Sequence, residues 1–172
     1  LSNFFVPIIT RYRNQREELS TVFSVTMNGA LVLALTLASL CYVTAPWVMM
    51  VAAPGLTGTD HELAVFLFRF MLPMLILHCL LAVIKGTLNS IDHYAMPEYA
   101  GVFFNLVMIA CALTLAGAYS ITSLAIGVVG GSIIQLLVQF PTLRQHGIRY
   151  HPAHGFNHPA LHEMRGLVLG AI

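Results

Sequence analysis

Long runs of apolar residues alternate with short polar connections along this chain. The runs cover about residues 22–53, 62–89, 97–118 and 121–143. Crossing the ~30 Å hydrocarbon core of a bilayer takes about 20 helical residues, so each run is long enough to span a membrane as a helix. A further apolar run begins near residue 160, and we expect it to be a truncated helix. The pattern predicts an all-α, polytopic transmembrane bundle with four complete helices and partial flanking ones.

Transmembrane strands do not fit these runs. A membrane strand shows alternating hydrophobicity over about 10 residues, whereas these runs are apolar on all faces for about twice that length. Lipid offers the backbone no hydrogen bonds, so each run must satisfy its own amides as a helix. Pro46, near the outer end of the first run, should bend or shorten that helix.

Lysine and arginine residues occupy alternate connections, which gives the chain an orientation. The residues of this kind outside the runs or at their ends are Arg11, Arg13, Arg16, Lys85, Arg144, Arg149 and Arg165. The connections around residues 55–62 and 117–123 contain none. Cytoplasmic loops of membrane proteins are enriched in Lys and Arg. We therefore place the connections that carry these seven cations, including Arg11, Arg13, Arg16 and Lys85, at the cytoplasmic face.

Composition supports the same class of protein. Hydrophobic residues make up 58% and charged residues 9% of the chain, against roughly 45–50% and about 25% in soluble domains. The mean hydropathy is +0.80. Cys41, Cys79 and Cys111 all lie within apolar runs without metal-ligand spacing, so we expect small buried hydrophobes. The chain starts at a leucine and stops within an apolar run, and we expect it to be a fragment of a longer protein.

Arg69 is the most costly residue to place in the membrane. It lies about seven residues into the second run, roughly 10 Å along a helix axis. A charge at full depth costs on the order of 2.5 kcal/mol or more. Its side chain either extends to the outer headgroups or faces a water-filled cavity and attracts an anionic headgroup. Pro73, one turn later, removes a backbone hydrogen bond and could bend the helix around such a cavity, so both residues are cavity candidates.

Small and amide residues recur every four positions along the fourth run, at Gly127, Gly131, Gln135 and Gln139. Small residues let helix backbones approach closely, and buried amides hydrogen-bond across such contacts. Helix packing is the simpler interpretation, and a hydrophilic lining is the alternative. We assign Gly127, Gly131 and Gln139 to packing, and we keep Gln135 with Asn105 of the third run as cavity candidates.

No catalytic arrangement is visible in the sequence. There is no nucleophile–base pair, glycine-rich phosphate loop or carboxylate pair with catalytic spacing, so we expect a protein that is not an enzyme. His154, His158 and His162 are four apart, as on a metal-binding helix face. Gly155 and Pro159 interrupt that helix. We expect no metal, no cofactor and no nucleic-acid partner.

Six groups of residues follow one another in an order found in one transporter family. They are Phe5-Val6-Pro7 with Tyr12, Ala45-Pro46-Trp47 before Ala53-Pro54-Gly55, Arg69 with Pro73 and Asn89, Pro97 with Asn105, Gly130-Gly131 with Gln135 and Gln139, and Gly170-Ala171-Ile172. Together they resemble the MurJ/MviN family of lipid II flippases, within the superfamily of multidrug, oligosaccharidyl-lipid and polysaccharide exporters. The resemblance covers essentially the whole chain, although the family usually has proline in the place of Gly170.

The resemblance implies a multi-pass protein of the bacterial inner membrane that moves the undecaprenyl-pyrophosphate-linked peptidoglycan precursor to the outer leaflet. Such transporters have two six-helix lobes around a cavity that opens alternately to each side. This chain would supply most of the N-terminal lobe, with membrane lipid and the rest of the transporter chain as its partners. Arg69 would then contribute positive potential to the cavity.

Two alternatives stay open. One is another polysaccharide-lipid or drug exporter of the same superfamily. A drug exporter should carry a coupling carboxylate within a membrane helix, and the interiors of these runs contain none, since Glu62 and Glu98 stand at their ends. The other alternative is a membrane scaffold that transports nothing, and such a scaffold would lack a hydrated cavity.

Overall fold

Four helices follow one another in the computed structural model, which describes residues 16–151 and their side chains from residue 19 onward. They are α2 (Arg16–Ala52), α3 (Thr59–Ser90), α4 (Ala95–Tyr119) and α5 (Thr122–Gln145). All four are long and apolar enough to cross a membrane, and the described range contains no strand. The predicted all-α class with four complete membrane helices is confirmed. The helix expected from about residue 160, and the histidines 154, 158 and 162, lie outside the described residues.

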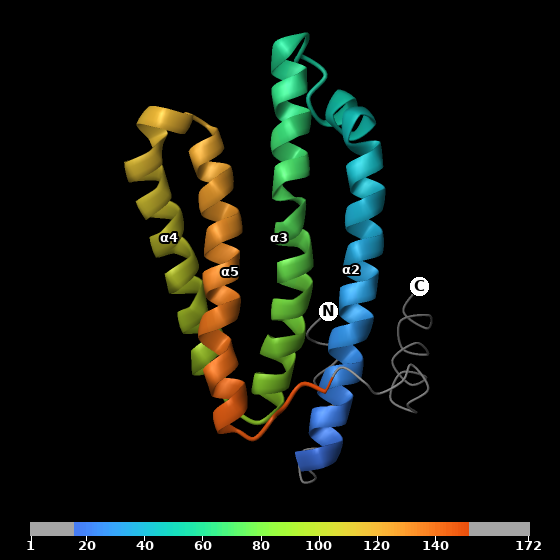
Figure 1. Ribbon diagram of the computed structural model, residues 1–172, viewed down its shortest axis with the longest axis vertical. Coiled ribbons are helices and arrows are strands. Elements are labelled where there is room, and N and C mark those ends of the chain that lie inside the picture. The colour runs from blue at the N-terminus through green and yellow to red at the C-terminus, as the bar shows by residue number, and fades with distance from the viewer. Residues whose placement is uncertain (1–15, 152–172) are drawn as a thin grey trace.

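The helices stand in one row in the order α4, α5, α3, α2 (Figure 1). Neighbours in this row pack on each other: α4 on α5, α5 on α3, and α3 on α2. Successive helices are antiparallel, with the turns at residues 53–58 and 120–121 at one end and the turn at residues 91–94 at the other. The first two turns contain no Lys or Arg, so we call their end the outer end and the opposite end the cytoplasmic end, as the charge pattern predicts.

Two of the helices are longer than a bilayer requires. α2 has 37 residues and α3 has 32, which correspond to about 55 Å and about 48 Å at 1.5 Å per residue. α2 is already helical at Arg16, the first described residue, whereas the apolar run starts near residue 22, and α3 begins at Thr59 instead of residue 62. The apolar pattern reports which residues suit lipid, whereas a helix can continue into the headgroup region and water beyond it.

Proline interrupts the hydrogen bonding of α2 without ending the helix. α2 continues past Pro46 to Ala52, and its last turns bend away from the axis of the rest of the helix (Figure 1). A proline has no N–H to donate to the carbonyl four residues earlier. Pro46 therefore leaves the carbonyl of Tyr42 without a donor inside the helix, and Pro73 does the same to the carbonyl of Arg69.

The apolar core lies at the cytoplasmic end of the row. Its buried members are Leu19, Val22, Phe23, Met27, Val83, Ile84, Leu88, Leu143 and Ile148. Farther out, α2 buries only small side chains, at Ala34, Ala38 and Ala45. Large apolar side chains of the outer half, such as Val43 and Trp47, are exposed where lipid would surround them. The inner ends of α2, α3 and α5 are therefore joined by large buried side chains, and α4 contributes none to this core.

After α5 the chain turns back toward α2. Gly147 has a φ of 77°, a left-handed conformation that commonly ends helices and that glycine adopts without steric cost. Residues 148–151, here called the return segment, then cross to the inner turns of α2 (Figure 1). Ile148 of this segment is buried in the core. The last described residues are thereby attached to the first described helix.

Candidate functional site

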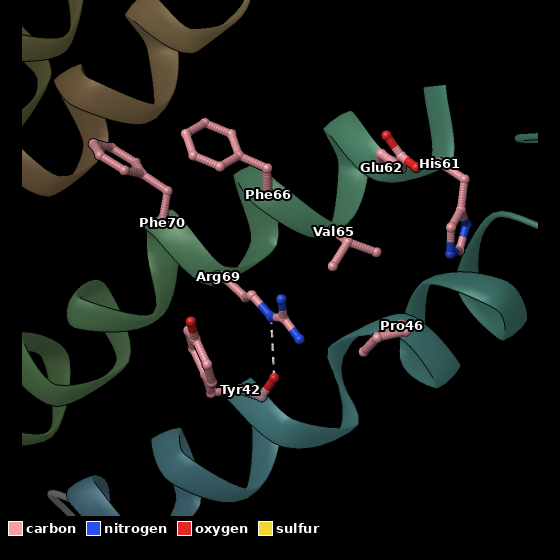
Figure 2. Close-up of a pocket in the computed structure, with 8 residues that line it drawn as sticks. All are labelled: Tyr42, Pro46, His61, Glu62, Val65, Phe66, Arg69 and Phe70. Atoms are coloured by element: carbon pink, nitrogen blue, oxygen red, sulfur yellow. Dashed lines mark hydrogen bonds between the residues drawn. The ribbon is translucent and has the colours of Figure 1, made fainter. Parts of the chain in front are cut away.

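The outer halves of α2 and α3 enclose a groove of about 570 Å³ around Arg69 (Figure 2). It is lined by Tyr42, Pro46, His61, Glu62, Val65, Phe66, Arg69 and Phe70. Figure 2 shows Arg69 and Val65 pointing from α3 toward α2, whereas Phe66 and Phe70 point away from α2. Arg69 lies about 15 Å along the axis from the first residue of α3. The groove therefore lies in the half of α3 nearer the outer end.

Arg69 hydrogen-bonds to the backbone of the neighbouring helix. Its Nε donates to the carbonyl oxygen of Tyr42 over 3.2 Å, and this is the carbonyl that Pro46 leaves without a helical donor. An unsatisfied backbone group in hydrocarbon costs several kcal/mol, so the arginine offsets the cost of the proline. Neither interpretation made from the sequence, extension to the headgroups or a free cation in a cavity, anticipated this partner.

The guanidinium group also stacks on Tyr42. Its Cζ lies 4.6 Å from the centroid of the tyrosine ring, within the ~6 Å range of cation–π attraction. An arginine has five N–H donors, and the contact with Tyr42 uses the one on Nε. Among the described residues, the terminal nitrogens thus remain available to an anionic ligand. Glu62 lines the same groove, so the groove contains one carboxylate beside one guanidinium and has no large excess of positive charge.

The other cavity candidates do not line this groove. Pro73 is exposed on α3 one turn beyond Arg69, Asn105 is exposed on α4, and Gln135 is half-buried on α5. α5 packs on α3, and α4 lies beyond α5 in the row, on the side away from α2 (Figure 1). Among the described residues, Asn105 and Gln135 thus do not share the groove around Arg69. A shared cavity for these residues stays a prediction.

Gly127 and Gly131 lie where α5 packs on α4. A Cβ atom added to Gly131 would lie 2.8 Å from Cδ2 of Phe104 and 2.9 Å from the carbonyl oxygen of Phe104. A Cβ added to Gly127 would lie 3.1 Å from the Cβ of Cys111. These separations are shorter than ordinary contacts, so the close approach of the two helices depends on the missing side chains.

Gln139 is buried, with 2% of its surface exposed. Its Nε2 donates to the carbonyl oxygen of Gln135 over 3.1 Å, within α5 and not across a helix contact as the stripe suggests. Its Oε1 has no hydrogen-bond partner among the described residues. A buried acceptor in this state costs about 1–3 kcal/mol. The side chain therefore fills space in the row while one of its polar atoms stays unsatisfied.

At the cytoplasmic end, Lys85 forms an ion pair with Glu98. Its Nζ lies 2.6 Å from Oε1 of Glu98, which joins α3 to α4. The two side chains are 44% and 72% exposed, so the pair contributes about 0–1 kcal/mol. Arg11 and Arg13 lie outside the described residues, and Arg16 is the first residue of α2. No group of three or more potential metal ligands occurs among the described side chains, residues 19–151.

A polar stripe on α2, which was not predicted from the sequence, holds the return segment. The backbone N–H of Arg149 donates to Oγ of Ser20 over 3.3 Å, and that of His151 donates to Oγ of Ser24 over 2.9 Å. The hydroxyl of Tyr150 donates to Oδ1 of Asn28 over 2.5 Å. The three α2 residues are four apart, and this spacing, which places them on one helix face, was the signal available in the sequence.

Four helices long and apolar enough to cross a membrane, joined by short turns, define a multi-pass α-helical membrane protein. Comparison with known protein families shows to which of them the chain is related. The family model described as "Lipid II flippase MurJ" matches residues 1–172. The chain belongs to this family, as the resemblance in its residue groups indicated.

Named relatives agree with the family assignment. The chain is 31% identical to the lipid II flippase MurJ of Burkholderia cenocepacia over 170 residues, which cover 93% of the chain and 33% of the relative. It is 30% identical to the probable lipid II flippase MurJ of Vibrio cholerae over 185 residues, covering 99% of the chain and 35% of the relative. A probable lipid II flippase MurJ of Buchnera aphidicola is 29% identical over 83% of the chain. The chain spans about a third of the length of these curated relatives.

Proposed function

We propose that the full-length protein containing this chain moves lipid II, the lipid-linked peptidoglycan precursor, from the inner to the outer leaflet of the bacterial inner membrane. The family match over residues 1–172 is the observation that supports this proposal. The protein would act as a transporter and not as an enzyme, since its substrate changes leaflet and no bond in it has to break. The rest of the transporter chain would supply the second lobe.

The physical problem of this reaction is the charge of the headgroup. A pyrophosphate has to cross an apolar layer of ~30 Å, and an ion in hydrocarbon is strongly disfavoured unless it is paired or hydrated. A protein can lower this barrier with cations held along a hydrated path. Arg69 is a cation in the outer half of the membrane, and its terminal N–H donors remain free among the described residues.

In this proposal Arg69 has two roles. The bond from its Nε to Tyr42 fixes α3 against α2 at the bend in α2, and its charge adds positive potential to the outward half of the path. The packed inner ends of α2, α3 and α5 would let these helices move as one body, as alternating access by rocking lobes requires.

Complementation tests the function. The full-length protein should restore growth and cell shape to bacteria depleted of their own lipid II flippase. Restoration would not be expected of a drug exporter or of a scaffold. A full-length protein that reaches the membrane in normal amount and restores nothing would contradict the proposal.

Variants of Arg69 test the role of this residue in the same assay. Arg69→Ala should impair complementation at normal membrane abundance, and Arg69→Lys, which keeps the charge, should impair it less. Full complementation by Arg69→Ala would remove Arg69 from the mechanism and leave the family assignment unchanged.

A further inference from the structure

A second cavity, of about 590 Å³, lies at the cytoplasmic end between α2, α5 and the return segment. One part of its lining is apolar and comes from the two helices: Phe23, Phe140 and Leu143. The other part is polar and comes from the end of α5 and the return segment: Arg144, Arg149 and Tyr150. The cavity is therefore amphipathic, and it stands apart from the groove around Arg69 at the outer end.

The two arginines of this cavity have no carboxylate partner among the described residues. Among the side chains described, residues 19–151, the ion pair found is that of Lys85 with Glu98, and no Asp or Glu of this range lines the cavity. Two positive side chains that line one cavity repel each other unless an anion lies between or beside them. The cavity thus has the electrostatic character of an anion site.

The position of Arg149 is fixed by contacts independent of its charge. Its own backbone N–H is bonded to Ser20, and the next two residues are bonded to Asn28 and Ser24. Arg144, in contrast, is placed by the last turn of α5. Two separate elements therefore bring cations to the same cavity, and the hydrogen bonds to α2 hold one of them there before any ligand binds.

The apolar part of the lining distinguishes a lipid from a small anion. Phe140 precedes Arg144 by one helical turn on α5 and so lies closer to the membrane core. A free phosphate would use only the arginines, whereas a phospholipid would place its phosphate on the arginines and an acyl chain along Phe23 and Phe140. Basic pockets between membrane helices on the cytoplasmic side are suited to anionic headgroups.

We propose that this cavity binds the phosphate headgroup of an anionic phospholipid from the cytoplasmic leaflet. Arg144 and Arg149 pair with the phosphate, for which the planar guanidinium group provides paired donors. The lipid neutralises the two cations and fills the space between α2, α5 and the return segment. This inference does not rest on the proposed transport activity.

The test measures lipid binding to the purified full-length protein. Native mass spectrometry in detergent would count bound phosphatidylglycerol during a titration, with phosphatidylcholine and inorganic phosphate as comparison ligands. Arg144→Gln and Arg149→Gln should each weaken phosphatidylglycerol binding about fivefold, since a surface Arg near anionic lipid contributes about 1 kcal/mol. Lys85→Gln is the matched control, because it removes one positive charge from the same membrane face but outside the cavity. Its binding should change less than about twofold.

Arg144→Lys keeps the charge and guards against loss of folding in the glutamine variants; it should lose less affinity than Arg144→Gln. Equal losses in the arginine variants and Lys85→Gln would indicate general surface attraction and overturn the proposal. Unchanged binding in both glutamine variants would do the same. Equal affinity for phosphatidylcholine, or displacement of the lipid by an equal concentration of inorganic phosphate, would also overturn the assignment to an anionic phospholipid.

Discussion

Nε of Arg69 donates a hydrogen bond of 3.2 Å to the backbone carbonyl oxygen of Tyr42, which has no donor within α2 because residue 46 is a proline. A helix-breaking proline and a charged residue are each costly in lipid when they stand alone. Here the donor that one helix lacks is supplied by the side chain of the other. The bend of α2 and the position of α3 are therefore coupled through a single hydrogen bond and the stacking of the guanidinium on the Tyr42 ring.

This coupling predicts a non-additive result in a double-mutant cycle. Arg69→Ala should lower the free energy of unfolding by about 1.5–3 kcal/mol, the usual range for a hydrogen bond to a charged group. In a Pro46→Ala background, the new N–H of residue 46 can bond to Tyr42, so the same change should cost on the order of 1 kcal/mol less. Thermal unfolding of the full-length protein in detergent would measure both. Strictly additive effects would contradict the coupling.

The contact between α4 and α5 predicts different effects for two adjacent glycines. Gly131→Ala should destabilise the protein by about 1–3 kcal/mol, because the new methyl group would overlap Phe104, including its backbone oxygen. Gly130→Ala is the matched control: its Cβ would lie 3.7 Å from Cγ1 of Val107, an ordinary contact. That change should be neutral or stabilise the helix by about 0.5–1 kcal/mol. Equal unfolding temperatures for the two variants would refute the close approach.

The unsatisfied Oε1 of Gln139 predicts that this buried amide is replaceable. Gln139→Leu removes an acceptor that costs about 1–3 kcal/mol and a donor bond within α5 that contributes about 1 kcal/mol. The unfolding temperature of the variant should therefore equal or exceed that of the parent. A marked decrease would mean that Oε1 has a partner in the full-length protein.

Pro73 predicts a local change in the shape of α3. Pro73→Ala restores a donor for the carbonyl of Arg69, so α3 should become straighter beyond this point. Pro73 is exposed, and the loss of its ring leaves no internal cavity. Water-soluble thiol reagents applied to single cysteines along α3, with Cys79 replaced, should give a shifted labelling pattern. An identical pattern with and without the proline would exclude a bend of functional size.

The orientation is testable with two substituted cysteines in a protein without Cys41, Cys79 and Cys111. Thr57→Cys lies in an outer turn and should react with a membrane-impermeant thiol reagent added to whole cells. Tyr94→Cys lies in the exposed turn at the cytoplasmic end and should react only after the cells are opened. The reverse result would invert the topology and place the Arg69 groove at the inner surface.

The sequence predicted the membrane helices well because lipid imposes a simple requirement. A backbone in hydrocarbon must form its hydrogen bonds with itself, so an apolar run long enough to cross the bilayer is predicted to be a helix. The helix ends were less predictable, as the extension of α2 back to Arg16 shows, because water and headgroups tolerate both helix and coil. Length and hydropathy therefore define the part of a helix in lipid and leave its ends open.

The surroundings of Arg69 needed the structure. That Pro46 frees the carbonyl of Tyr42 can be read from their spacing of four, but Arg69 is 27 residues from Tyr42. Which face of α3 meets which turn of α2 is a matter of packing. The order of the helices in the row likewise cannot be predicted from their alternating direction, because antiparallel helices can be arranged in several ways. For this reason the sequence could not show that Asn105 and Gln135 do not line the groove around Arg69.

The return segment has a consequence for how the protein is made. Its bonds join Tyr150 to Asn28, 122 residues apart, and Arg149 to Ser20, 129 residues apart. At about 5–20 residues per second of synthesis, a ribosome needs roughly 6–25 s to deliver the second partner after the first. During that interval the side-chain oxygens of Ser20 and Asn28 cannot yet accept the bonds from the return segment. The inner end of the row can therefore close only after the last of the four helices has been inserted.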